Sequence, residues 1–217
     1  MRMRKKNHGA ERIEACAHLL ITPTAEIKMN LQSAFTEERP IHLEIGCGKG
    51  NFAVGMAAQH HDVYFIAMEK IADVACLALE TAEKAKDTRP DNLRFVIGDA
   101  KNLVEYFPAH SIDCIYLNFS DPWPKNRDRE KRLTSCTFLE KYKQILAPGA
   151  RICFKTDNRP LFDFSLQTFP ASGFVLENVC FDLHNDPMNE TNIETEYERK
   201  FSEKGFTINR LEAYLPL

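Results

Sequence analysis

The alternation of short apolar runs with segments of helical periodicity, from residue 41 to residue 183, most constrains the fold. The apolar runs are rich in β-branched and aromatic residues, as is typical of buried strands, and cover residues 41–46, 63–69, 93–100, 112–119, 150–157 and 174–183. The predicted helices between them cover residues 51–60, 71–86, 134–146 and 160–169. Such alternation forms right-handed βαβ units. The sequence therefore predicts an α/β fold with a mostly parallel sheet and helices on both faces, in which a run at 205–215 supplies a seventh strand.

The 217 residues fit one such domain, which we expect at 41–217. Before it, residues 1–40 form a basic arm and a helical extension with patterns at 11–21 and 25–35. The net charge of -3 does not suggest a general polyanion binder, so any nucleic-acid contact must come from local patches.

The seven cysteines are odd in number and lack a CxxC pair. This argues against a disulfide framework and a zinc site, and favours a reducing compartment. No apolar stretch approaches the ~20 residues that span a bilayer, and no signal peptide is visible. We expect a cytoplasmic protein without membrane contact, either a monomer or a homodimer.

Three consecutive predicted strands end in groups suited to a nucleoside, at the sheet edge where parallel sheets bind ligands. The first precedes the turn LEIGCGKGNF, whose glycines let the backbone approach a ligand closely. The second ends in Glu69, which could accept both hydroxyls of a ribose, and the third in Asp99, placed to accept from an exocyclic amine. Each feature alone is often only a turn or a solvated acid, but together they favour a bound nucleoside. Because the glycine spacing is not GxGxxG, a dinucleotide oxidoreductase is disfavoured.

The fourth predicted strand is followed by NFSDPWPKNRDREKR, residues 118–132. Its two prolines restrict the residues before them, so we expect extended backbone at Asp121 and Trp123 and a stiff loop that projects the Asp121 carboxylate. We interpret Trp123 as a packing anchor in preference to a base-stacking platform. The basic run after it predicts phosphate contacts, with a solvated surface as the alternative.

These motifs resemble known methyltransferases. The glycine turn with Glu44, Glu69 and Asp99 is similar to class I S-adenosylmethionine-dependent methyltransferases, which implies a Rossmann-like fold and this methyl donor. The motifs NFSDPWPK, KTDNRPLF and ETEYERKF narrow the resemblance to bacterial tRNA (guanine-N7-)-methyltransferases. The resemblance implies methyl transfer, without a metal, to N7 of a guanine in the variable loop of tRNA.

The resemblance also implies a role for each motif. Asp121 would be catalytic. The residues that would bind the donor are Glu44, Gly46, Gly48, Glu69, Asp99 and Asp121. The residues that would bind the substrate are Lys125, Asp157, Thr195, Glu196, Tyr197 and Glu198. The cations that would contact RNA are Arg127, Arg129, Lys131 and Arg132. This chain departs from the family's more continuous basic loop by inserting Asp128 and Glu130.

Guanine chemistry fits this set of acids. Guanine N7 carries a lone pair and no proton, so the reaction needs alignment and charge stabilisation and no general base. We expect Asp157, or an acid of the TEYE segment, to accept from the N1–H and amine edge of guanine. Two alternatives remain: a methyltransferase that acts on a protein or small molecule, and a non-catalytic RNA-binding protein. The basic run argues against a small apolar acceptor, and the acids that follow the strands argue against a non-catalytic protein.

Overall fold

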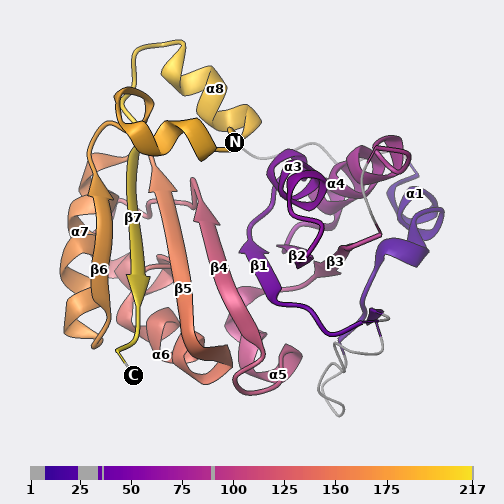
Figure 1. Ribbon diagram of the computed structural model, residues 1–217, viewed down its shortest axis with the longest axis horizontal. Coiled ribbons are helices and arrows are strands. Elements are labelled where there is room, and N and C mark those ends of the chain that lie inside the picture. Colours follow the sequence, from indigo (N-terminus) through magenta and orange to yellow (C-terminus); the bar gives the residue numbers. More distant parts are fainter. Residues whose placement is uncertain (1–7, 24–33, 36, 89–90, 217) are drawn as a thin grey trace. The chain divides into compact units, whose positions relative to one another are not determined.

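The computed structural model describes residues 8–23, 34–35, 37–88 and 91–216, in two compact units that cover residues 1–108 and 109–217 (Figure 1). The predicted basic arm and most of the helical pattern at 25–35 lie outside the described residues. No helix in the described part of the chain is long and apolar enough to cross a membrane.

The first unit contains three parallel strands in the order β3-β2-β1. Its elements are α1 (Gly9–Glu14), the 3-10 helix η1 (Ala17–Leu19), β1 (Ile41–Ile45), α3 (Asn51–Gln59), β2 (Tyr64–Glu69), α4 (Ala72–Lys84), β3 (Leu93–Ile97), η2 (Ala100–Asn102) and α5 (Leu103–Tyr106). The central strand β2 is apolar along nearly its whole length and buried, as expected for a strand covered on both faces. Small residues on the inner face of α4, among them Ala75, Ala78 and Ala82, are fully buried and let this helix pack closely.

The N-terminal helical segment packs within the first unit. Arg12 forms a bidentate pair with Glu80 of α4, at 2.7 and 2.8 Å. Leu19 is buried, and Leu20 forms a parallel β-bridge to Phe95 of β3. The predicted helical pattern at 11–21 is thus two short helices, which end where the chain meets the sheet. The domain boundary expected at residue 40 stays a prediction.

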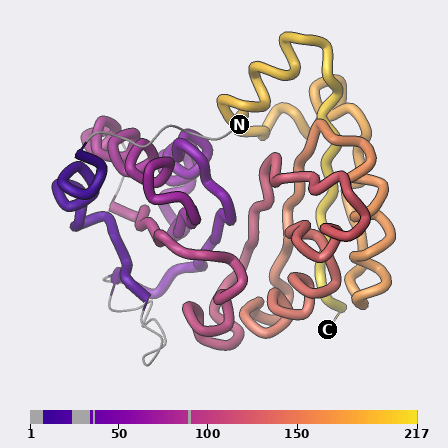
Figure 2. The backbone as a smooth tube through the Cα atoms, turned by 180° about the vertical axis from the view of Figure 1, so that it is seen from behind, coloured from indigo at the N-terminus to yellow at the C-terminus, as the bar shows by residue number. Residues whose placement is uncertain are grey.

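The second unit contains four strands in the order β4-β5-β7-β6. Its elements are β4 (Ile112–Asn118), η3 (Asn126–Lys131), α6 (Cys136–Ile145), β5 (Leu146–Thr156), α7 (Arg159–Ala171), β6 (Val175–Cys180), η4 (Leu183–Asn185), η5 (Pro187–Thr191), α8 (Glu196–Ser202) and β7 (Asn209–Tyr214). β4 and β5 are parallel, whereas β7 pairs antiparallel with both β5 and β6. Within this unit, α6 and α7 cover one face of the strands, and α8 lies beyond the carboxyl ends of β4 and β5 (Figures 1 and 2).

The seven strands and their directions confirm the predicted mostly parallel, seven-stranded α/β architecture. Two elements that carry candidate site residues were not predicted. These are the 3-10 helix η3, within the basic run, and the helix α8, which begins in the TEYE motif.

Candidate functional site

The glycine turn of the first unit joins β1 to α3 and is tied to the end of β2. The N–H groups of Gly46 and Cys47 donate to the carbonyl of Met68, at 2.8 and 3.0 Å. Gly46 and Gly48 have φ of +83° and +57°, angles that favour glycine, and a Cβ at either would meet nothing within 4 Å. Gly50 is needed for a different reason, which is close packing: a Cβ there would lie 3.0 Å from the Cβ of Ala78. The first two glycines thus leave open space beside the turn, as close approach of a ligand requires.

Glu69 is fixed in orientation by the same turn. Its Oε2 accepts from the N–H of Gly48 at 3.1 Å, and its Oε1 accepts from the N–H of Ile71 at 2.9 Å. Each carboxylate oxygen can accept a second hydrogen bond. The oriented carboxylate therefore fits the predicted recognition of two ribose hydroxyls. In this respect the residues of the turn suit a donor that contains a nucleoside.

Asp99, the predicted partner of an exocyclic amine, is half-buried after β3. Its carboxylate accepts from the N–H of Lys101 at 3.0 Å and lies 2.7 Å from Nζ of Lys70. Partial burial by itself would raise the pKa of Asp99, but the hydrogen bonds from Lys70 and from the Lys101 N–H outweigh it, and the pKa lies below its ordinary value. Asp99 is therefore a charged acceptor that is already partly engaged.

Glu44 lies at the end of β1 and is only 2% exposed. Beside it, burial and then the charges of Glu44 and Glu69 raise the pKa of the Cys47 thiol well above its ordinary value. The Cys47 thiol therefore stays protonated, and sequence reasoning assigned it no role. In the first unit the structure brings the predicted residues Glu44, Gly46, Gly48 and Glu69 to one turn.

In the second unit, Asp121 is exposed and follows β4. The expectation of extended backbone at Trp123 is wrong, because its φ is +41°, in the left-handed region. Arg132 explains how this conformation is held. Its guanidinium donates to the carbonyls of Pro122 and Trp123, at 3.0 and 3.1 Å, and lies 4.3 Å from the ring centroid of Phe164. The loop is stiffened by an arginine clamp in addition to its two prolines.

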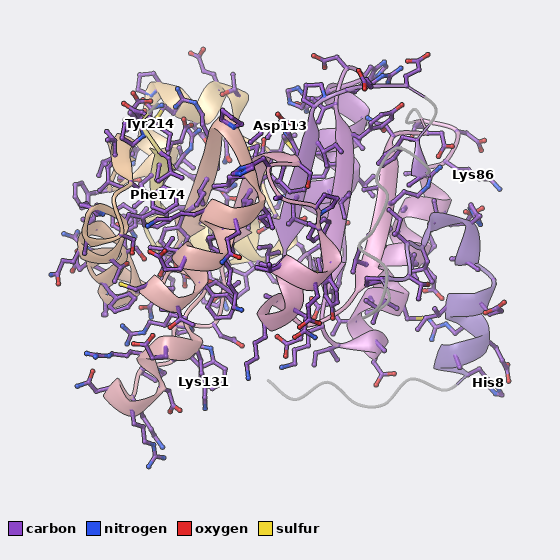
Figure 3. The ribbon with its side chains drawn as sticks, turned by 90° about the horizontal axis from the view of Figure 1, so that it is seen from below. His8, Lys86, Asp113, Lys131, Phe174 and Tyr214 are labelled. Carbon is purple, nitrogen blue, oxygen red and sulfur yellow. The ribbon has the colours of Figure 1, made fainter. Side chains whose placement is uncertain are left out.

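The basic run forms η3, and Figure 3 shows Lys131 on this projecting segment. The two inserted acids have local partners. Asp128 accepts from Lys131 at 2.7 Å, and Glu130 accepts from Thr137 at 2.6 Å. The side chains of Arg127, Arg129 and Lys131 remain 77%, 59% and 52% exposed. Lys125 is also exposed, at the N-cap of η3. These four cations can contact phosphate, whereas Arg132 is engaged in the loop.

Trp123 is half-buried, so the predicted packing role holds only in part. Nζ of Lys131 lies 4.8 Å from its ring centroid, which is cation–π geometry. The Trp123 ring is therefore in contact with Lys131 of the basic run.

Asp157 follows β5, and the hydroxyl of Tyr197 donates to its Oδ2 at 3.3 Å. Tyr197 is 42% exposed. Its ring lies between Phe119 and Phe201, with centroid distances of 5.1 and 4.1 Å. The structure thus brings Asp157 and Tyr197 of the predicted substrate residues into contact.

Thr195 and Glu198 form a capping box at the start of α8. The Thr195 hydroxyl accepts from the Glu198 N–H at 2.9 Å, and the Glu198 carboxylate accepts from the Thr195 N–H at 3.3 Å. The letters T-x-x-E before a helix are a known sequence signature of this cap, so this role was readable in the sequence. Glu196, the second residue of the motif, is half-buried and lies 3.6 Å from Lys200 across one turn.

Sequence reasoning also missed the hydrogen-bonding neighbours of Glu198, which are Lys155, His184 and Asn192. They come from three separate segments, so no local pattern could have grouped them. In the described residues no group of three or more His, Cys, Asp or Glu side chains could hold a metal ion.

Known proteins are similar to this chain in sequence and in fold. Residues 38–211 match the family described as "Putative methyltransferase". A tRNA (guanine-N(7)-)-methyltransferase of Exiguobacterium sp. is 45% identical over 98% of this chain and 97% of the relative. The protein of the same name from Limosilactobacillus reuteri is 44% identical over 98% and 99%. The chain belongs to the tRNA (guanine-N(7)-)-methyltransferase family.

A solved structure supports the fold of this family member. The 16S rRNA methyltransferase KamB has a TM-score of 0.65 and 14% identity, over 88% of this chain and 95% of that chain. At this identity the likeness concerns the fold alone, and it confirms the predicted Rossmann-like class I methyltransferase fold.

Proposed function

We propose that this chain transfers a methyl group from S-adenosylmethionine to N7 of a guanine in the variable loop of tRNA, forming 7-methylguanosine. The observation that carries the proposal is the similarity, over nearly the full length of both chains, to proteins named tRNA (guanine-N(7)-)-methyltransferase. The motifs around Asp121, Asp157 and Tyr197 fall within the matched residues. The seven cysteines are free thiols, which suits a cytoplasmic setting.

S-adenosylmethionine supplies an electrophilic methyl group on a sulfonium. The glycine turn and Glu69 would hold it, through the open space beside Gly46 and Gly48 and the oriented carboxylate. Glu44 and Asp99 are the other acids assigned to the donor.

Guanine N7 has no proton to lose, so the chain needs no general base for the attack. Positive charge moves onto the purine during transfer, and carboxylates stabilise such charge. Asp121 is the acid assigned to the transfer, and Asp157 is assigned to the N1–H and amine edge of guanine. Phosphates of the tRNA are assigned to the four exposed cations of the projecting basic segment, which are Lys125, Arg127, Arg129 and Lys131.

Incubation with isotopically labelled methyl donor and an unmodified tRNA transcript tests the proposal, with nucleoside analysis after digestion. We expect labelled 7-methylguanosine, and the loss of label when the variable-loop guanine is replaced by adenine. Label on another nucleoside, or on protein and not on RNA, would contradict the proposal. Donor binding measured by calorimetry separates a methyltransferase from a non-catalytic RNA-binding protein.

A further inference from the structure

Glu198 is a buried carboxylate whose hydrogen-bonding capacity is filled. The residue is 0% exposed. Its Oε2 accepts from Nζ of Lys155 at 2.7 Å and from the N–H of Thr195 at 3.3 Å. Its Oε1 accepts from Nδ2 of Asn192 at 2.8 Å and lies 3.0 Å from Nε2 of His184. A carboxylate has about four acceptor sites, so these four donors leave none for the edge of a guanine.

The ammonium group of Lys155, on β5, has its hydrogen-bonding capacity filled as well. The residue is 6% exposed, and its ammonium group donates to Glu198, to Oδ1 of Asn192 at 2.8 Å and to the carbonyl of Ile193 at 3.1 Å. These contacts account for its three protons. The resulting network of Lys155, His184, Asn192 and Glu198 joins β5, η4, the segment after η5 and α8.

The network lies directly beside the contact between Tyr197 and Asp157. Lys155 and Asp157 are two residues apart at the end of β5, and Glu198 and Tyr197 are adjacent in α8. The same two elements are therefore joined twice, once by a buried charge pair and once by the Tyr197 hydroxyl on Asp157. A buried charge pair adds little stability compared with apolar packing, and its best-attested use is to fix one arrangement of the elements it joins.

We propose that the Lys155–Glu198 network is a positioning device that holds the Tyr197 hydroxyl on Asp157, and that Glu198 itself contacts no substrate. Tyr197 then fixes one oxygen of Asp157 and sets the angle at which its carboxylate meets a guanine. This part of the inference rests on the proposed function, because guanine recognition by Asp157 belongs to it.

The positioning can be tested without any substrate, by NMR titration of the full chain carrying ¹³C-labelled tyrosine side chains. Burial, followed by the charge and hydrogen bond of Asp157, raises the pKa of Tyr197 to about 12. Tyr197→Phe assigns the signal. In Glu198→Gln and in Lys155→Met we expect Tyr197 to titrate nearer the ordinary tyrosine pKa of about 10, because the hydroxyl no longer rests on Asp157.

Glu203→Gln is the matched control, since it makes the same chemical change at an exposed residue directly after α8. It should leave the Tyr197 titration unchanged. If a single variant fails to fold, the apolar pair Lys155→Met/Glu198→Met restores packing without charge, and it too should lower the pKa of Tyr197. If Tyr197 titrates as in the wild type in variants of Lys155 and Glu198 that are folded, the proposal is overturned.

A kinetic cycle tests whether Glu198 acts through Tyr197. We expect Tyr197→Phe and Glu198→Gln each to lower kcat/KM for tRNA roughly tenfold, as for the loss of one hydrogen bond to a charged group, with donor affinity unchanged. Because both changes break the same contact, the double variant should lose no more than Glu198→Gln alone. If the loss of kcat/KM in the double variant equals the product of the two single losses, Glu198 contacts the substrate independently, and the proposal is wrong. A wild-type chain that does not methylate tRNA would refute the proposed function while leaving the NMR result to stand by itself.

Discussion

Two carboxylates of this chain suit opposite tasks, and the difference lies in the number of donors around them. Glu69 accepts from two backbone N–H groups, one on each oxygen, among the described residues. Glu198 meets four donors, two on each oxygen. The first arrangement orients a carboxylate and leaves acceptor capacity for a ligand, whereas the second uses all of it. At the residue scale, counting donors separates an acid that binds from an acid that positions.

Asp121 should matter for the chemical step more than for binding. We expect Asp121→Asn to lower the methyl-transfer rate at saturating donor and tRNA by roughly 10²-fold, the size of effect seen when one preorganised electrostatic partner is lost. Single-turnover kinetics measures this rate. Asp163→Asn, the same change at an exposed pair on α7, should leave the rate intact. A near-normal rate in Asp121→Asn would remove the catalytic assignment.

Gly48 should be needed both for the backbone conformation of the turn and for binding of the methyl donor. Alanine at its φ of +57° should cost about 1–2 kcal/mol of unfolding free energy. Its Cβ would also occupy the space beside the turn, so donor affinity measured by calorimetry should fall. Gly149→Ala is the matched control, because Gly149 has φ of +78° and equally open surroundings. It should lose similar stability with unchanged donor affinity, and equal donor affinity in both variants would argue against a donor site at the turn.

At the element scale, the segment from Asp121 to Arg132 divides its cations between two tasks. Arg132 holds the carbonyls of Pro122 and Trp123, while Arg127, Arg129 and Lys131 are exposed on η3. The inserted acids Asp128 and Glu130 take part in local ion pairs and hydrogen bonds of this short helix. The departure from a more continuous basic loop therefore has a structural cause.

The exposed and the engaged arginines should respond differently to substitution. Arg129→Gln should weaken tRNA binding and reduce the log–log salt slope by ~0.7–0.9, the value for one phosphate contact. Arg132→Gln should lower methyl transfer by loosening the loop, with a nearly unchanged slope. Filter binding over a range of salt concentrations measures both slopes. If Arg132→Gln changes the slope as much as Arg129→Gln does, the clamp is also a phosphate contact.

At the scale of the whole molecule, several carboxylates have pKa values below their ordinary range. The hydrogen bond from Lys86 lowers the pKa of Glu83. For Glu198, burial by itself would raise the pKa, but the charge and hydrogen bond of Lys155 outweigh it, and the pKa is lowered. Asp99 follows the same pattern with Lys70. A carboxyl with a lowered folded pKa stabilises the protein above its unfolded pKa of about 4.

The unfolding free energy should therefore fall as the pH drops from about 5 through the folded pKa values of these groups. Urea unfolding at a series of pH values measures the fall. Glu198→Gln removes one of these carboxyls, so the unfolding free energy of this variant should depend less steeply on pH. At neutral pH its unfolding free energy should be lower than that of the wild type. Glu203→Gln should keep the wild-type dependence, and an equally steep fall in Glu198→Gln would show that Glu198 is not linked to acid stability.

The sequence by itself determined the order of strands and helices, because apolar periodicity and glycine turns are local properties. It also located the acids that follow the strands, since parallel strands present their carboxyl ends at one edge. Only the tertiary structure decided what surrounds them. The left-handed φ of Trp123 is held by Arg132, nine residues away, and the carboxylate of Glu198 is filled by Lys155 and His184 from other elements. Burial and donor count depend on contacts between distant segments. Those contacts place Arg132, a predicted RNA contact, on the carbonyls of its own loop, and Glu198, a predicted substrate acid, in a hydrogen-bonded network.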